Sequence, residues 1–187
     1  MNCSLVKTQL IRWLALSTVG LALIGCIPQA PTDSETVYQD SRMNASVTYL
    51  HLLRHTPFFT ELNDEQLKWV IKHSREWDAP AGTVLDSRAA GTAVSSDLWV
   101  LLDGGWQVET QTNAYAAGNG APGKWYSPAQ TQSDNRLVTI QRSYVMRIKA
   151  ADLQTMLAQN FPFERHLSIG RAWYAHISAA QPRAVAP

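Results

Sequence analysis

The chain has 187 residues, of which 45% are hydrophobic and 17% are charged, and this composition is typical of a folded globular protein. The length predicts one domain with extensions. A formal net charge of +1 argues against a nucleic-acid-binding protein, which would carry a clear basic excess.

The two cysteines, Cys3 and Cys26, both lie near the N-terminus. The rest of the chain contains no thiol. A disulfide-stabilised scaffold, a thiolate metal site and a cysteine nucleophile are therefore excluded from everything that follows Cys26.

Residues 1–26 have the pattern of a bacterial export signal. Lys7 and Arg12 precede the apolar run Trp13–Leu23, whose length of about ten residues is typical of a signal peptide and short for a membrane span. The run ends in Leu23-Ile24-Gly25-Cys26, which resembles the lipobox of bacterial lipoproteins.

This resemblance implies that residues 1–25 are a cleaved signal peptide and that Cys26 becomes the acylated N-terminal residue, with palmitate among its acyl groups. Several acyl chains together give stable membrane attachment. Ile27 stands where an aspartate would retain an enteric lipoprotein in the inner membrane, so the outer membrane is favoured. We therefore expect a cell-envelope protein that faces the periplasm. The alternative is an uncleaved N-terminal anchor that happens to contain a cysteine.

Residues 26–43 are predicted to form a flexible tether, because Pro28, Pro31 and the polar residues around them offer no periodic apolar face. The folded domain is predicted over residues 44–180. The tail, 181–187, is predicted to be disordered.

Two helices are predicted at the start of the domain. Residues 44–56 place apolar side chains at helical spacing, and Pro57 ends this segment. A second helix is predicted to begin at Asn63, because Asn63 and Gln66 have the spacing of a capping box, and to run to about Ser74.

The β region is predicted to begin at Thr83, after a turn at 79–82. The side chains of residues 98–102 and of residues 106–110 follow the two-residue period of β-strands. Asp103-Gly104-Gly105 lies between the two segments and predicts a hairpin. The first of these strands is apolar on both faces, so we expect it to be central and Val100 to be buried.

Three tryptophans, Trp99, Trp106 and Trp125, fall in this region and are expected in the core, the alternative being an aromatic ligand face. Residues 114–128 are predicted to form a loop, because they contain Gly118, Gly120, Pro122 and Gly123.

The last part of the chain is predicted to form two strands and two helices. The strands are residues 136–141 and 143–148, joined by a tight link. The helices place apolar residues at helical spacing over 153–161 and 167–177, and Asp152 is a candidate cap of the first of them.

The order of helices, short strands and helices predicts an α+β protein. Five short segments resemble the cyclic-nucleotide-binding domain family. They are Phe58-Phe59-Thr60-Glu61-Leu62, Pro80-Ala81-Gly82-Thr83-Val84-Leu85, Leu98-Trp99-Val100-Leu101-Leu102-Asp103-Gly104, Arg136-Leu137-Val138-Thr139-Ile140, and the helix positions Leu153, Met156 and Leu157. The resemblance covers about Leu50 to Phe163 and implies an antiparallel β-roll, or jelly roll, with flanking N- and C-terminal helices.

One motif of that family is changed in this sequence. The resemblance implies a Phe-Gly-Glu motif whose glutamate binds the ribose hydroxyl, and the nearest match here is Pro122-Gly123-Lys124. An ammonium group cannot accept that hydrogen bond. Arg136 matches the arginine that pairs with the phosphate, although a longer polar loop precedes it. We therefore expect no useful binding of cyclic nucleotides and interpret Arg136 as a surface charge at a strand end.

No metal or catalytic site is evident. The histidines fall in predicted helices, and His51 and His55, four residues apart, have no third ligand nearby in the sequence. A nucleophile elbow, a phosphate-binding loop and a paired-carboxylate motif are absent from the predicted β core. We expect neither a cofactor nor enzymatic activity.

These features predict a membrane-anchored periplasmic lipoprotein that acts as a non-catalytic protein-binding module, of an immunity or envelope-accessory type. The alternative is a sensor of a small anionic ligand, held in the cavity of the β-roll by Arg136 and Lys124. An occupied polar cavity favours the sensor, whereas a filled apolar roll with an exposed aromatic patch favours protein binding.

Overall fold

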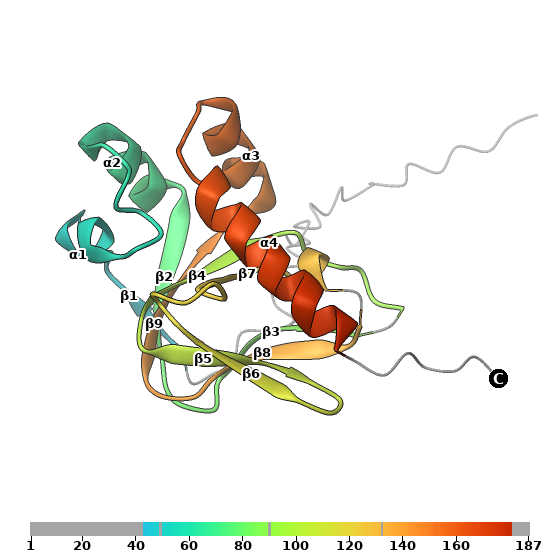
Figure 1. Ribbon diagram of the computed structural model, residues 1–187. Coiled ribbons are helices and arrows are strands. Elements are labelled where there is room, and N and C mark those ends of the chain that lie inside the picture. The colour runs from blue at the N-terminus through green and yellow to red at the C-terminus, as the bar shows by residue number, and fades with distance from the viewer. Residues whose placement is uncertain (1–42, 49, 90, 132, 181–187) are drawn as a thin grey trace, which may run out of the picture. The chain divides into compact units, whose positions relative to one another are not determined.

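A computed structural model describes residues 43–48, 50–89, 91–131 and 133–180 (Figure 1). Within these ranges, nine strands form two antiparallel sheets. The five-stranded sheet has the order β1 (Asn44–Ser46), β2 (Ser74–Ala79), β9 (Ser143–Ile148), β4 (Leu98–Asp103) and β7 (Trp125–Tyr126). The four-stranded sheet has the order β3 (Val84–Arg88), β8 (Asn135–Thr139), β5 (Gly105–Thr110) and β6 (Ala114–Gly118).

In the chain, two helices lie between β1 and β2, a 3₁₀ helix lies between β7 and β8, and two helices follow β9. They are α1 (Leu50–His55), α2 (Asp64–Lys72), the 3₁₀ helix η2 (Pro128–Gln130), α3 (Ala150–Ala158) and α4 (Glu164–Ala179). Figure 1 shows α4 passing over β7, and α1 packs beside α2. The predicted fold class, an antiparallel roll with flanking N- and C-terminal helices, is confirmed.

The predicted capping box at the start of α2 is present. The backbone N–H of Gln66 donates to Asn63 Oδ1 at 2.9 Å, and the backbone N–H of Asn63 donates to Gln66 Oε1 at 3.1 Å. These two bonds satisfy donors that the first turn of a helix leaves unpaired. The helix ends at Lys72, slightly earlier than predicted, and His73 is its C-cap.

Four strands and one cap differ from the prediction. The segment 44–46, predicted as helix, is strand β1, and β2, β6 and β7 were not predicted at all. These strands are short or lack an alternating apolar pattern, and pairing with neighbouring strands outweighs their local preference. Lys149, not Asp152, occupies the N-cap position of α3, and Asp152 lies in its first turn.

Strand β4 lies at the centre of the core, as predicted. It pairs with β9 on one side and β7 on the other, and Val100 has no exposed surface. All residues from Leu98 to Leu102 are buried. Trp99 makes the link to the other sheet directly, because its Nε1–H donates to Asp86 Oδ2 of β3 at 2.8 Å. The expectation that Trp99, Trp106 and Trp125 are buried is confirmed.

The predicted hairpin between β4 and β5 is wrong, because the two strands belong to different sheets. The chain crosses from one sheet to the other at Gly104, whose φ is +93°. A Cβ atom there would lie 2.5 Å from Ser143 Oγ and 2.7 Å from the Arg142 carbonyl oxygen, so both the conformation and the space require glycine. The hydroxyl of Ser143, where β9 begins, donates to the Gly105 carbonyl at 2.9 Å and accepts from the Gly105 N–H at 3.0 Å.

The predicted signal peptide (1–25), Cys26, the tail (181–187) and the predicted tether (26–43) apart from Met43 lie outside the described residues. Among the residues that are described, none of the helices combines the length and the apolar character that crossing a membrane requires.

Candidate functional site

Arg136 lies on the solvent-facing side of β8. Its side chain is 60% exposed, and its guanidinium Nη2 pairs with Glu109 Oε2 at 2.6 Å. Arg136 and Glu109 are direct cross-strand partners on β8 and β5. The arginine that the resemblance assigns to phosphate binding is therefore part of a surface ion pair.

Lys124 lies just before β7, and its neighbours differ from those of Arg136. Its backbone is held within the roll, because Leu101 N–H donates to the Lys124 carbonyl at 2.9 Å. Burial lowers the pKa of the Lys124 ammonium, and the positive charge of Arg165 on α4 lowers this pKa further. Lys124 therefore faces the start of α4, whereas Arg136 faces Glu109 on β5.

The loop before Lys124, which matches the sugar-phosphate segment of the resemblance, is covered by the rest of the fold. The indole Nε1–H of Trp106 donates to the Gly123 carbonyl at 2.8 Å. Gly123 also lies under the Trp173 ring of α4, because an added Cβ would come within 2.8 Å of that ring. This loop is packed between the sheet and α4.

Polar side chains within the roll are bonded to one another. Tyr126 Oη donates to Asn135 Oδ1 at 2.5 Å, and Asn135 Nδ2 donates to Thr131 Oγ1 at 2.6 Å. Burial raises the pKa of Tyr126, so the phenol stays protonated as a donor. The exposed large apolar side chains among the described residues are aliphatic and consist of Val47, Val94, Ile140 and Ile169. The exposed aromatic patch that would mark a protein-binding face is therefore not found among them.

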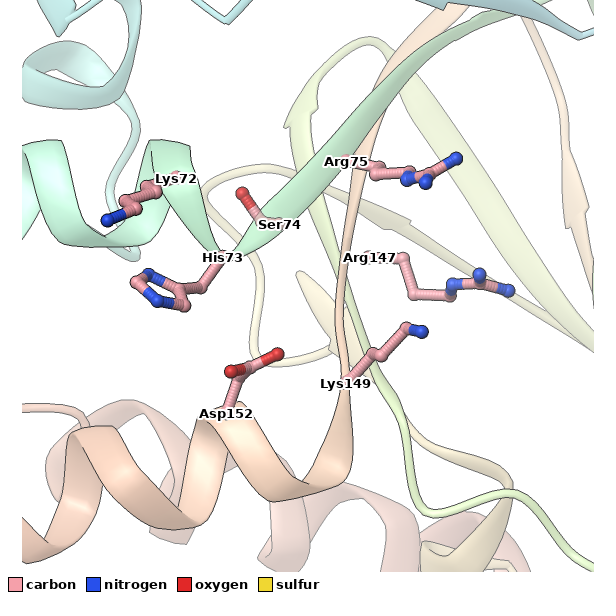
Figure 2. A pocket seen from close by; sticks show the side chains of 7 residues that line it. All are labelled: Lys72, His73, Ser74, Arg75, Arg147, Lys149 and Asp152. Carbon is pink, nitrogen blue, oxygen red and sulfur yellow. The ribbon is translucent and has the colours of Figure 1, made fainter. Parts of the chain in front are cut away.

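A cleft of about 260 Å³ opens where α2, β2, β9 and α3 meet (Figure 2). Four basic side chains and one carboxylate line it, together with a histidine and a serine. The lining residues are Lys72, His73, Ser74, Arg75, Arg147, Lys149 and Asp152. The cleft is therefore strongly cationic.

The strand register brings three of these cations together. Arg75 on β2 lies directly opposite Arg147 on β9. Lys149 follows Arg147 by two residues and continues in the same direction. Figure 2 shows the charged ends of all three extending the same way. The sequence did not predict this group, because β2 was not recognised and Arg75 had no expected partner.

The guanidinium of Arg147 is held in place by its surroundings. It lies 5.4 Å from the ring centroid of Trp77 and 5.8 Å from that of Trp99. Its Nε is 3.9 Å from Asp97 Oδ2, and the other oxygen of Asp97 accepts from the Ala150 N–H at 3.0 Å. Two aromatic faces and one carboxylate therefore fix the orientation of this arginine.

The described residues were also considered as possible ligands of a metal ion. Within the described part of the chain, no three histidine, cysteine or acidic side chains are grouped so that they could hold a metal ion. His51 and His55 both lie on α1, where a ring nitrogen of His55 is 2.6 Å from the His51 carbonyl oxygen.

No protein-family model matches the sequence, and no curated protein matches it. Solved structures do match the fold. PKAR CBD2 with Sp-2Cl-cAMPS bound has a TM-score of 0.54 at 12% identity, covering 71% of this chain and 88% of that one. PfPKA-R with cAMP bound has a TM-score of 0.54 at 12% identity, covering 71% of this chain and 45% of that one. The chain therefore has the cyclic-nucleotide-binding-domain fold.

Proposed function

We propose that this chain is a lipid-anchored, non-catalytic binding module of the bacterial cell envelope whose partner is a protein. The observation that carries the proposal is the position of Arg136, which is exposed and paired with Glu109 on the solvent side of the roll. An arginine that is to bind the phosphate of a cyclic nucleotide must point into the nucleotide pocket. The outward pair supports a domain that keeps the fold and binds its partner from outside.

The chemistry of Lys124 supports the same conclusion. An ammonium donates hydrogen bonds and accepts none, so it cannot replace the carboxylate that would bind the ribose hydroxyl. The loop that ends at Lys124 is bonded to Trp106 through Gly123 and covered by Trp173. A nucleotide would have to displace these contacts to reach the position that the resemblance implies.

The proposed lack of catalytic activity is supported by the hydrogen bonds of three buried polar residues, Asp86, Tyr126 and Asn135. The Asp86 carboxylate accepts one hydrogen bond from Trp99 Nε1–H and one from the Ser87 N–H, each at 2.8 Å. Tyr126 and Asn135 are bonded to each other. These groups hold the two sheets together, and such internal bonds leave them poorly suited to proton transfer with a substrate.

The anchor is proposed from the Leu23-Ile24-Gly25-Cys26 segment, whose cysteine would carry the acyl chains. An envelope location separates the domain from the cytoplasmic pool of cyclic nucleotides. A protein of the same compartment is then the expected partner, which agrees with an immunity or envelope-accessory role.

Titration calorimetry with cyclic AMP and cyclic GMP tests the loss of the nucleotide site. The whole chain, purified in a non-ionic detergent, should give no saturable heat at micromolar concentrations. Micromolar binding that Arg136→Ala abolishes would overturn the proposal and support the anionic-ligand sensor instead.

Cross-linking in intact cells tests the partner. A lysine-reactive reagent, followed by mass spectrometry, should join this chain to one envelope protein in a defined set of residue pairs. Cross-links confined to copies of this chain would contradict the proposed protein partner.

A further inference from the structure

Strand β6 lies at one edge of the four-stranded sheet, and the described residues place no strand on its outer side. It pairs with β5 alone, in continuous register from Gly105 opposite Gly118 to Glu109 opposite Ala114. Figure 1 shows β6 at the rim of this sheet. An edge strand presents unpaired backbone N–H and C=O groups, and another strand can bind to them.

The pairing with β5 indicates which backbone groups of β6 point outward. Thr110 N–H donates to the Asn113 carbonyl at 2.8 Å, so these two residues form a hydrogen-bonded pair at the end of the hairpin. Hydrogen-bonded and non-hydrogen-bonded pairs alternate along antiparallel strands, so Tyr115 and Ala117 are the residues of β6 that bond to β5. The residues whose backbone groups point away from β5 are Ala114, Ala116 and Gly118.

The other edge strands of the described sheets have features that oppose pairing with a further strand. The register of β3 is irregular between Val84 and Asp86, and Arg88 of the same strand donates to the Pro128 carbonyl of η2 at 3.1 Å. Strands β1 and β7 are three and two residues long. Strand β6 has five residues in continuous register, with neither a charged side chain nor a proline. Irregular register, charge, proline and short length are the usual protection of a sheet edge, and β6 has none of them except its modest length.

The side chains of β6 are complementary to those of a second copy of β6 that runs antiparallel to it. A two-fold axis at Ala116 places Ala116 opposite itself, Ala114 opposite Gly118, and Tyr115 opposite Ala117 of the other copy. Each phenol ring then lies beside a methyl group, and like charges do not meet. A shift of two residues in either direction would leave two hydrogen-bonded pairs instead of three, so this register is favoured.

A second copy also suits this edge better than a foreign peptide does. When a strand is added to a sheet, backbone hydrogen bonds provide the affinity and side-chain pockets provide the selectivity. The exposed side chains of β6, those of Ala114 and Ala116, are methyl groups and select weakly among foreign sequences. A second β6 has the same length and is already ordered by its pairing with β5, so it loses little conformational entropy on binding.

We propose that two copies of this chain pair through β6, antiparallel and centred on Ala116, so that their two four-stranded sheets join into one. This pairing forms about six backbone hydrogen bonds. The Gly118 carbonyl already accepts from the Ala121 N–H at 3.0 Å, and its second lone pair accepts from the other copy. The pairing depends neither on the proposed protein partner nor on a lipid at Cys26.

Disulfide formation tests the register in the whole chain, purified in a non-ionic detergent. Ala116→Cys should give a disulfide-linked dimer on mild oxidation, because the Cα atoms of a hydrogen-bonded pair are about 5.5 Å apart, which is within the range of a disulfide. Ala114→Cys should give at least tenfold less dimer, because the two substituted positions lie about 14 Å apart along the strands. All variants also carry Cys3→Ser, and a chain without a new cysteine measures the contribution of Cys26.

A double substitution tests the same register at a second position. Ala114→Cys/Gly118→Cys should recover dimer formation, because Ala114 faces Gly118 of the other copy, whereas Gly118→Cys alone should not. A Cβ atom on Gly118 meets no atom within 4 Å, so the fold tolerates this change. Equal disulfide formation by Ala116→Cys and Ala114→Cys would indicate random collision and overturn the proposal.

Opposite charges at the two-fold axis separate pairing through β6 from other causes of association. Ala116→Lys and Ala116→Glu each place like charges opposite each other, and each should lower the dimer fraction at least tenfold. An equimolar mixture of the two variants should recover the dimer, and a misfolded protein would not recover in this way. Ala116 is exposed, so the melting temperature of both variants should stay close to that of the wild type. Val94→Lys, in an exposed loop, is the control and should stay dimeric.

Light scattering during gel filtration measures the dimer fraction, at a protein concentration well below that of the detergent micelles. A monomeric wild-type chain would overturn the proposal, as would a dimer that Ala116→Lys leaves intact. A monomer whose β6 is cross-linked to another envelope protein in cells would identify a foreign strand at this edge, and would equally overturn the pairing of two copies.

Discussion

A buried carboxylate, Asp86, connects the two sheets through Trp99. Its side chain is 8% exposed and accepts hydrogen bonds from the Trp99 indole and the Ser87 backbone. Burial raises the pKa of this carboxyl above its ordinary value of 3.8, and the hydrogen bonds oppose the rise only in part. Asp86 therefore holds its proton more tightly in the folded chain than in the unfolded chain.

This raised pKa has a defined effect on stability. The protonated Asp86 carboxyl contributes to the free energy of unfolding. This contribution is fully present below about pH 3.8 and is lost as the pH rises through the pKa of Asp86 in the folded chain. Asparagine has no such proton, so the melting temperature of Asp86→Asn relative to the wild type should rise as the pH increases from about 4 to about 7. Thermal unfolding followed by circular dichroism measures this difference.

Asp103→Asn is the matched control, because Asp103 is an exposed carboxylate at the end of β4. A similar trend in both variants would mean that total charge, rather than the burial of Asp86, controls the effect.

At the scale of elements, α4 is joined to the sheet through Trp125. The indole Nε1–H of Trp125 donates to the His166 carbonyl at 2.9 Å, and Tyr174 Oη donates to the Trp125 carbonyl at 2.6 Å. Gly170 lies between His166 and Tyr174 on the same helix face. A Cβ atom on Gly170 would be 2.2 Å from Trp125 Nε1, so the indole fits against the helix only because this residue has no side chain.

Gly170→Ala should therefore destabilise the domain even though alanine favours helix formation by about 1 kcal/mol. The added methyl group overlaps the indole, and overpacking of this kind costs about 1–3 kcal/mol, to which loss of the Trp125 hydrogen bond adds. Urea unfolding gives the free energy of unfolding. Gly118→Ala on β6 is the control, because its added methyl group would meet no atom within 4 Å. A Gly170→Ala protein as stable as wild type would show that α4 is not seated on Trp125.

Strand β4 provides a second test of element packing. Val100→Asp would bury an unpaired carboxylate at a position with no exposed surface and should cost about 4 kcal/mol or more. The same change at Ile140, which is 47% exposed, should have a small effect. Comparable losses at both positions, measured by urea unfolding, would contradict the central position of β4.

At the scale of the whole molecule, the fold and the cationic cleft belong to the described residues, and the proposed anchor lies outside them. The fold alone does not distinguish a nucleotide sensor from a protein-binding module, because one architecture supports several functions. The surface pair of Arg136 with Glu109 is the feature that favours binding at the outside of the roll.

The anchor itself is tested by lipid labelling. Cys26→Ser should abolish incorporation of labelled palmitate and leave the precursor uncleaved, because the thiol is the acceptor of the lipid. Cys3→Ser should label normally, because Cys3 would leave with the signal peptide. Recovery of wild-type protein with Met1 intact, determined by mass spectrometry, would rule out the lipobox interpretation.

The sequence by itself determined the features that arise within a short stretch of chain. The capping box of Asn63 and Gln66 depends on hydrogen bonds across one helical turn, and it was predicted correctly. The burial of Val100 and the strands β4, β5, β8 and β9 followed from local periodicity and composition.

The tertiary structure alone decided which strands pair and which side chains meet. The chain enters the other sheet at Gly104, where Ser143 and Arg142, residues distant in the sequence, leave no room for a side chain. Arg75 faces Arg147 only because β2 pairs with β9 in one register, and β2 has too little alternation to be recognised as a strand. Local patterns report propensity, whereas partners and register are selected by the packing of the whole core.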